Sequence, residues 1–265
     1  MLIRALCLLL IVLPYSPLKA KDPLSLDRIV VIGASVSRGF TESEPFGGEK
    51  SKLLRFDRYL DAALRAPHGK IVNDSNHLFF VSPEKESAKQ LERLRHRKPT
   101  LVIGIDYLFW YLYGYPENTG DRLELFDRGL ESLSKIEVPL IIGDIPDASA
   151  SIGHMLARAM VPDAETRSEA NRRLAAWAAK RPQVSVISLS SFLRSCEANA
   201  AITVGPLSLK QGSTRELLQA DRLHPTPMGC ATLALAVFAS FDGDDLKPDQ
   251  IVWNPAEILR LIPVD

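Results

Sequence analysis

Two short segments near opposite ends of this 265-residue chain carry the side chains of a nucleophile and its base. In the first, the apolar residues 29–32 are followed by glycine and then by Ser35, a pattern typical of a buried strand that ends in a tight turn. In the second, Asp221 stands three residues before His224. Serine attacks a carbonyl when a histidine takes its proton and a carboxylate orients that histidine. The pattern therefore predicts acyl transfer by Ser35, His224 and Asp221.

The same two segments resemble the motifs of the SGNH (GDSL-type) hydrolases. In that family the nucleophile follows the first strand, and an Asp-x-x-His-Pro segment precedes the last helix. Ser35 and Gly39 stand at the family's spacing, although Ala34 replaces the aspartate of Gly-Asp-Ser, and residues 221–229 fit the late motif. The likeness spans roughly residues 27–241. It implies an esterase or lipase with a single-domain, three-layer α/β/α fold around a parallel, flavodoxin-like sheet.

The segments that should form the oxyanion hole depart from that family. The glycine that relatives have after the second strand corresponds best to Ser82-Pro83, and proline has no N–H to donate. The asparagine of a Gly-x-Asn-Asp motif corresponds to Asp106, which only accepts hydrogen bonds when ionised. We expect Ser82, Asp106 and Tyr107 on the oxyanion or substrate side of the site, with the Ser35 N–H as the surest donor. The triad thus predicts an enzyme, and the altered oxyanion hole predicts a modified one.

Asp106 has two interpretations. If its carboxylate faces the oxyanion, Asp106→Asn should raise the esterase rate about tenfold or more, because oxyanion donors contribute on that scale. If Asp106 points away, held by a helix N-terminus or an arginine, the rate will not rise. Ser82 likewise has a structural interpretation, because serine, proline and glutamate at 82–84 make a good helix start. The aromatic residues within 107–115 fit either the core or a substrate-facing wall.

Apolar runs alternate with amphipathic segments along the chain, which predicts a parallel sheet with helices on both faces. The expected strands are 28–33, 70–73, 101–104, 139–143 and 184–189. The expected helices are 52–64, 82–97, 121–135, 164–180 and 226–241. Because ligands of such sheets bind beyond the carboxyl ends of the strands, the polar residues that follow the strands should meet at one edge: Ser35, Ser82, Asp106 and Asp144.

Composition suits one globular domain, with 46% hydrophobic residues and 32 basic against 32 acidic ones. This balance gives no reason to expect a nucleic-acid partner. Residues 1–20 resemble a secretion signal, with Arg4 before an apolar stretch and Ala20 as a candidate cleavage position. They predict a secreted or periplasmic domain over residues 21–265, with an uncleaved anchor as the alternative. Residues 242–265 are expected to lie on that domain as an appendage.

The histidines and cysteines show no metal-ligand spacing, so neither a metal nor another cofactor is expected. Cys196 and Cys230 suit either one disulfide or two buried thiols. The expected ligand is a small-molecule, carbohydrate or lipid ester, and no partner protein is evident.

Two other functions stay open. One is a binding or scaffold protein that kept the fold and lost efficient catalysis, which Pro83 and Asp106 would explain. The other is a nucleotide-binding oxidoreductase, suggested by the turn around Gly33. Against it, the complete Gly-x-Gly-x-x-Gly pattern is missing from the sequence, and no Tyr-x-x-x-Lys pair occurs after the expected secretion signal.

Overall fold

The strands of this protein are short and form one parallel sheet. The computed structural model describes residues 24–116, 118–241 and 245–263. Within these residues the strand order is β2-β1-β3-β4-β5, and each pairing is parallel. The strands are β1 (Ile29–Val31), β2 (Val72–Asn73), β3 (Leu101–Gly104), β4 (Leu140–Gly143) and β5 (Val184–Ile187). The five predicted strands are confirmed, and four of them are shorter than predicted.

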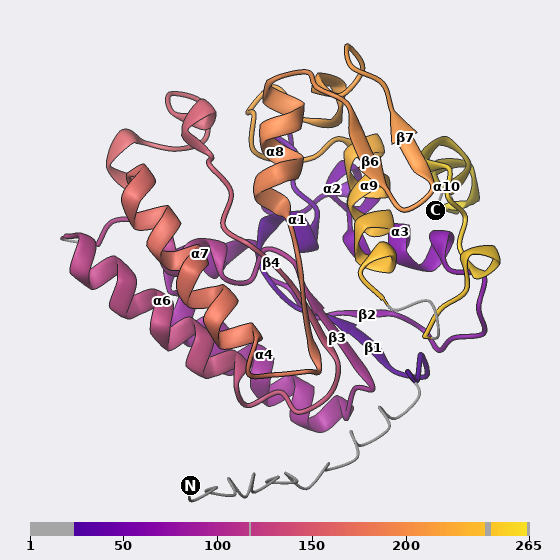
Figure 1. Ribbon diagram of the computed structural model, residues 1–265, viewed down its shortest axis with the longest axis horizontal. Coiled ribbons are helices and arrows are strands. Elements are labelled where there is room, and N and C mark those ends of the chain that lie inside the picture. Colours follow the sequence, from indigo (N-terminus) through magenta and orange to yellow (C-terminus); the bar gives the residue numbers. More distant parts are fainter. Residues whose placement is uncertain (1–23, 117, 242–244, 264–265) are drawn as a thin grey trace, which may run out of the picture.

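Helices cover both faces of this sheet, as Figure 1 shows. One face carries α4 (Pro83–Arg97), α6 (Thr119–Leu133) and α7 (Ala164–Ala178). The other carries α3 (Phe56–Ala63), α9 (Pro227–Ala239) and α10 (Pro255–Leu261). The predicted single-domain α/β/α fold with a flavodoxin-like parallel sheet is therefore confirmed.

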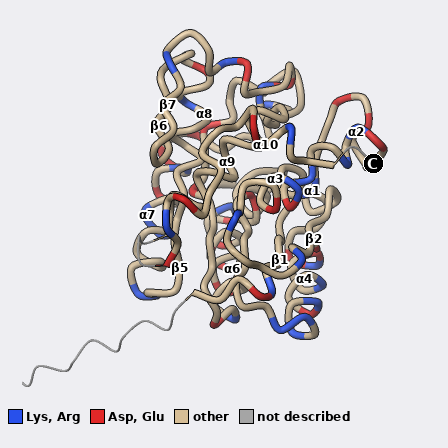
Figure 2. The backbone as a smooth tube through the Cα atoms, turned by 90° about the vertical axis from the view of Figure 1, so that its right-hand side faces the viewer, with Lys and Arg blue, Asp and Glu red and all other residues tan. Residues whose placement is uncertain are grey.

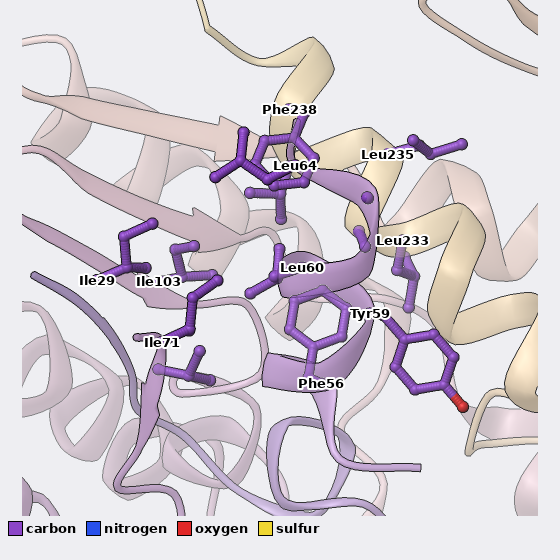
Figure 3. Close-up of a cluster of buried hydrophobic side chains, with 14 of the residues drawn as sticks. Ile29, Phe56, Tyr59, Leu60, Leu64, Ile71, Ile103, Leu233, Leu235 and Phe238 are labelled. Atoms are coloured by element: carbon purple, nitrogen blue, oxygen red, sulfur yellow. The ribbon is translucent and has the colours of Figure 1, made fainter. Parts of the chain in front are cut away.

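The alternation of side chains along β1 builds the two hydrophobic layers. Ile29 and Val31 belong to the buried cluster under α3 and α9, whereas Val30 and Ile32 belong to the cluster under α4 and α6. Successive side chains of a strand point to opposite faces, so an unbroken apolar run is what a sheet covered on both sides requires. Figure 3 shows the first cluster, with Ile29 of β1 near Phe56 of α3.

The predicted helix over residues 52–64 is wrong as one element, because two helices occupy this region. A short α2 (Glu49–Leu53) ends before α3 begins at Phe56. Arg55 between them has an extended ψ of 126°, and its guanidinium binds the Asp57 carboxylate in the first turn of α3 at 2.7 and 3.1 Å. An acidic residue in the first turn favours a new helix start at this point.

Several short elements were not predicted. They are α1 (Ser35–Arg38), the 3-10 helix η1 (His77–Val81), α5 (Phe109–Leu112), α8 (Leu189–Glu197) and the antiparallel pair β6 (Ile202–Val204) and β7 (Leu207–Leu209). The last predicted strand ends early because Ser188 caps α8, its side chain accepting the N–H of Ser191.

The C-terminal segment packs on α3. The Val252 N–H donates to the Ala63 carbonyl, the Arg65 N–H donates to the Gln250 carbonyl, and Ile258 is fully buried. This segment therefore extends the helical layer on that side of the sheet.

Cys196 and Cys230 are separate buried thiols, and burial raises the pKa of the Cys196 thiol to about 12. The predicted signal, residues 1–20, lies outside the described residues. Within the described part of the chain, every helix is too short or too polar to cross a membrane. In Figure 2 basic and acidic residues are interspersed along the tube, as the balanced composition predicts.

Candidate active site

The nucleophile turn, residues 33–37, leaves β1 and opens α1 at the carboxyl edge of the sheet (Figure 1). Gly33 has a φ of 128°, and a Cβ there would collide with the Asp106 carboxylate, so the turn requires glycine. The buried Gln90 amide of α4 pairs with both backbone groups of Gly33, accepting its N–H at 2.8 Å and donating to its carbonyl at 2.9 Å. This pairing gives both backbone groups of Gly33 a partner at the point where the chain turns away from β1.

Ser35, His224 and Asp221 form one hydrogen-bonded chain. His224 Nε2 lies 2.8 Å from Ser35 Oγ, and His224 Nδ1 lies 2.6 Å from Asp221 Oδ2. The other carboxylate oxygen of Asp221 accepts the N–H groups of Leu223 and His224, each at 2.9 Å. The structure therefore brings together the three residues that the sequence singles out, with the histidine in the middle. This arrangement permits a proton to pass from Ser35 to His224.

The late loop, residues 217–226, is closed by its own backbone before α9 begins. The Gln219 N–H donates to the His224 carbonyl and the Thr226 N–H donates to the Leu217 carbonyl, both at 2.8 Å. Thr226 then caps α9 by accepting the N–H of Gly229. The Phe40 ring stacks on the His224 imidazole with centroids 3.9 Å apart. The imidazole is thereby fixed on one face by the ring and at its end by Asp221.

The Asp221 carboxyl is charged in this environment. Burial opposes its ionisation, but the hydrogen bonds from the His224 ring and from two backbone N–H groups outweigh burial and lower its pKa below the usual value. Asp221 and His224 are 1% and 2% exposed, so the pair is shielded from water. A carboxylate held in this way stabilises an imidazolium and fixes its tautomer.

Asp106 serves the nucleophile turn itself, which favours the second of its two interpretations. Its carboxylate accepts the N–H groups of Ala34, Val36 and Ser37 at 3.1, 2.8 and 3.1 Å, and the Ser37 hydroxyl at 2.6 Å. Both oxygens are therefore occupied by the start of α1. Within the described residues no hydrogen bond uses the Ser35 N–H, which leaves it available to an oxyanion.

Ser82 and Tyr107 lie away from this chain of hydrogen bonds. Tyr107 is fully buried, and its hydroxyl contacts those of Ser87 and Ser132 between α4 and α6. Ser82 stands at the start of α4 and does not line the pocket at Ser35. The physical reason is that residues 74–81, including η1, separate the end of β2 from Ser82, so Ser82 starts the next helix instead of following the strand.

The segment that borders the nucleophile turn after β2 is residues 74–76. The Asp74 N–H donates to the Val31 carbonyl at 2.8 Å, and the Asn76 N–H donates to the Gly33 carbonyl at 3.0 Å. The predicted match of the second-strand glycine with residues 82–83 is therefore misplaced by seven residues or so. The end of the predicted strand at Asn73 is the signal that marks the correct place.

A pocket ends on Ser35 and His224 and is lined almost entirely by apolar side chains. Phe109 and Trp110 come from α5, whereas Leu189 and Phe192 come from α8. All five aromatic residues from Tyr107 to Tyr113 belong to one buried cluster, and two of them, Phe109 and Trp110, also line the pocket. Such a lining suits the apolar part of a ligand.

Sequence reasoning missed the residues that support this site from a distance. Gln90 had a recognisable signal, because it is a polar residue on the buried face of α4 beside Leu91 and Leu94. Asp144, which follows β4, accepts the Ser190 N–H at 2.7 Å and so holds α8 against the pocket rather than entering it. In the described part of the chain no group of three or more His, Cys, Asp or Glu side chains suits a metal ion.

The likeness of this chain to known proteins lies in its three-dimensional fold. No family model and no curated protein sequence matches this chain. A solved lipase/acylhydrolase from Enterococcus faecalis has 17% identity and a TM-score of 0.50, covering 86% of this chain and 98% of its own. The acetylxylan esterase Axe2 from Geobacillus stearothermophilus has 17% identity and a TM-score of 0.51, covering 82% and 96%.

A gut microbial diltiazem-metabolizing enzyme has 12% identity and a TM-score of 0.53 over 82% of this chain and 47% of its own. At these identities the shared feature is the three-dimensional arrangement of strands and helices. The chain therefore has the fold of the SGNH hydrolases, as the resemblance of its two motifs implies.

Proposed function

We propose that this protein is an exported serine hydrolase that cleaves carboxylic esters with Ser35, His224 and Asp221. The observation that carries the proposal is the hydrogen-bonded chain from Ser35 Oγ through the imidazole to the Asp221 carboxylate, at 2.8 and 2.6 Å. The fold neighbours, a lipase/acylhydrolase and an acetylxylan esterase, support the same class of reaction. The apolar pocket at Ser35 supports an ester with an apolar acyl or alcohol part.

In the first half of the reaction, Ser35 Oγ attacks the ester carbonyl carbon while its proton passes to His224 Nε2. Asp221 stabilises the imidazolium that forms. The carbonyl oxygen becomes an oxyanion, and the Ser35 N–H donates to it. His224 then gives the proton to the departing alkoxide oxygen, so that an alcohol leaves and the acyl group stays on Ser35.

In the second half, water attacks the acyl-serine. His224 Nε2 takes a proton from that water as the new C–O bond forms. Collapse of the tetrahedral intermediate breaks the bond to Ser35 Oγ, and the proton returns from His224 to that oxygen. The products are a carboxylic acid and the free enzyme.

A second candidate function is an SGNH-fold binding protein with weak or lost catalysis. Asp106 favours it, because the acceptor carboxylate stands where relatives have an asparagine donor and takes three N–H groups of the nucleophile turn. One oxyanion donor fewer typically costs on the order of 100- to 1000-fold in rate.

Hydrolysis of p-nitrophenyl acetate by the purified protein separates the two functions. The esterase proposal expects turnover that Ser35→Ala abolishes without changing the circular dichroism spectrum. Turnover that survives Ser35→Ala would point to a different nucleophile. A wild-type protein as inactive as Ser35→Ala on a series of short and long acyl esters would favour the binding function.

Export is proposed on the sequence of residues 1–20, with its basic start and apolar stretch. N-terminal sequencing of the protein recovered outside the cytoplasm tests it. The proposal expects a chain that begins near Lys21, whereas a chain that begins at Met1 and stays with the membrane would support the uncleaved anchor.

A further inference from the structure

Large apolar side chains that remain exposed are concentrated at the edge of the sheet where Ser35 lies. Within the described residues there are eight of them, and two, Val186 and Leu261, lie on β5 and α10. The other six lie in the connections that leave the carboxyl ends of β1, β2 and β3: Phe46, Leu53, Leu78, Phe80, Val81 and Tyr115. Such connections lie at the ligand-binding edge of a parallel sheet. These exposed apolar side chains therefore lie at the same edge as Ser35.

Four of these side chains lie on η1 or line one hollow with it, and we call them the apolar rim: Phe46, Leu78, Phe80 and Val81. Their exposed fractions are 68%, 46%, 41% and 67%. Phe46 and Leu78 line one hollow together. The Phe80 ring lies 5.6 Å from the ring of Trp110, which lines the pocket that ends on Ser35.

The apolar rim is held outward by residues that face inward from the same 3-10 helix. Phe79 is fully buried and packs edge-on against Tyr107 with centroids 5.2 Å apart. His77 donates from Nε2 to the Gly39 carbonyl at 2.5 Å. Because η1 is anchored at His77 and Phe79, Leu78 between them and Phe80 and Val81 beyond them face solvent in a fixed arrangement. Clustered apolar exposure of this kind marks an interaction site.

The charges beside the apolar rim identify the kind of surface that fits it. The hollow that contains Phe46 and Leu78 is also lined by Arg38 and Arg93. The acid in this hollow, Asp74, is bound by Arg97 at 2.5 and 2.8 Å and also lies 3.8 Å from Arg93, so one carboxylate faces two guanidinium groups. Arg38 forms no ion pair within the described residues, so positive charge remains next to exposed apolar groups. Phospholipids offer the matching combination of phosphate groups above hydrocarbon.

We propose that the apolar rim binds the surface of a phospholipid bilayer and thereby places the apolar pocket against lipid. On the proposed ester hydrolysis, on which this second part rests, an ester chain would enter between Trp110 and α8 and present its carbonyl to Ser35. The apolar path from Phe80 through Trp110 to the catalytic serine makes that entry continuous.

Vesicle co-sedimentation of the full-length protein in the Ser35→Ala background tests the docking surface separately from catalysis. The probe is a mixed phosphatidylcholine and phosphatidylglycerol vesicle. Two rim variants are compared, Phe80→Ser/Val81→Ser and Phe46→Ser/Val81→Ser, with Val186→Ser/Leu261→Ser as the matched control. All variants share the N-terminal segment, so its contribution to vesicle binding is common to them. Chemical unfolding midpoints confirm that each variant is folded.

We expect both rim variants to weaken partition onto vesicles about tenfold or more, because each loses two apolar side chains from the contact, and the control to stay within about twofold. Equal partition of rim and control variants would overturn the proposal, as would wild-type protein that does not bind these vesicles. A dimer in sedimentation that the rim variants convert to monomer, without vesicle binding, would assign the rim to a second copy instead. An inactive wild-type protein that still binds through the rim would refute the esterase and leave the docking surface standing.

Discussion

The two parts of the candidate active site are held in place in different ways. The late loop is closed by contacts among near neighbours, since Asp221 and His224 are three residues apart and the backbone groups of Gln219 and His224 pair with each other. The nucleophile turn depends on distant partners, because Gln90 and Asp106 bind it from 57 and 72 residues away. The hydrogen bonds of His224 and Asp221 are therefore local, with the Phe40 ring as a distant contact, whereas the turn that carries Ser35 depends on the packing of α4 and the end of β3.

The late loop contains one buried carboxylate and the nucleophile turn is bound by another, and the two carboxylates have different roles. Asp221 and Asp106 both accept backbone N–H groups, but only Asp221 also binds an imidazole, the ring that gains and loses a proton in the proposed mechanism. The charge of Asp221 is therefore part of the chemistry, whereas Asp106 contributes acceptor atoms to the shape of the turn. Replacement of each by its neutral amide distinguishes these roles.

Asp221→Asn should have the largest effect on rate among the variants that keep both Ser35 and His224. The amide would present an N–H₂ group to Nδ1 and favour the wrong imidazole tautomer. We expect kcat for p-nitrophenyl acetate to fall on the order of 10⁴-fold with the circular dichroism spectrum unchanged. A fall of less than about tenfold would mean that Asp221 does not orient a catalytic base.

Asp106→Asn should lower both rate and stability. An amide has one acceptor oxygen for donors that now approach both carboxylate oxygens, so at least one N–H of the turn loses its partner. We expect the free energy of unfolding to fall by about 1–3 kcal/mol and kcat to fall by up to about 100-fold through displacement of Ser35. A rate above that of the wild type would instead show that the carboxylate opposes the oxyanion.

Gln90→Leu and Asn171→Leu make a matched pair, one at the nucleophile turn and the other at the connection after β4. Each amide accepts the N–H and donates to the carbonyl of one residue beyond a strand, Gln90 with Gly33 and Asn171 with Ile145. Both changes should lower the free energy of unfolding by about 1–3 kcal/mol. Only Gln90→Leu should lower kcat, by about tenfold, because only Gly33 adjoins the nucleophile. Equal rates in the two variants would show that this hydrogen bond does not position Ser35.

Low pH should lower the free energy of unfolding through His77, whose ring binds the Gly39 carbonyl at the end of α1. Burial lowers the pKa of His77, so the folded protein binds this proton less tightly than the unfolded chain. The contribution of His77 to stability is therefore present above the unfolded value of about 6.5 and is lost as pH falls below it. Urea midpoints of wild type should fall more than those of His77→Gln between about pH 8 and about pH 5.5. Parallel falls in the two proteins would contradict this assignment.

The parts of the fold and site that could be predicted from the sequence are those that depend on residues close together in the chain. Apolar runs located the five strands, and the Asp221–His224 spacing located the base, because in each case the residues that interact are close in sequence. The start signal at Ser82 and Pro83 was also correct for a helix, but it said nothing about which strand end lies beside Ser35. That information rests on the pairing of Asp74 and Asn76 with residues of β1 and the turn.

Long-range contacts explain what could not be predicted. Asp106 follows β3, and the N–H groups that it accepts follow β1. These two strands are far apart in the sequence but adjacent in the sheet. The pocket helix α8 was missed because the alternation of apolar residues with serine over residues 184–189 runs past the end of β5 into the first residue of the helix.

The most direct test of the account is the site of covalent labelling by a fluorophosphonate. Mass spectrometry of the digested protein should find a single adduct on Ser35 in the wild type. His224→Gln should label far more slowly, because the proton of Ser35 then has no acceptor, and Asp106→Asn should label at a reduced rate at the same residue. An adduct on another serine, or ester hydrolysis by a protein that forms no adduct, would contradict catalysis by Ser35.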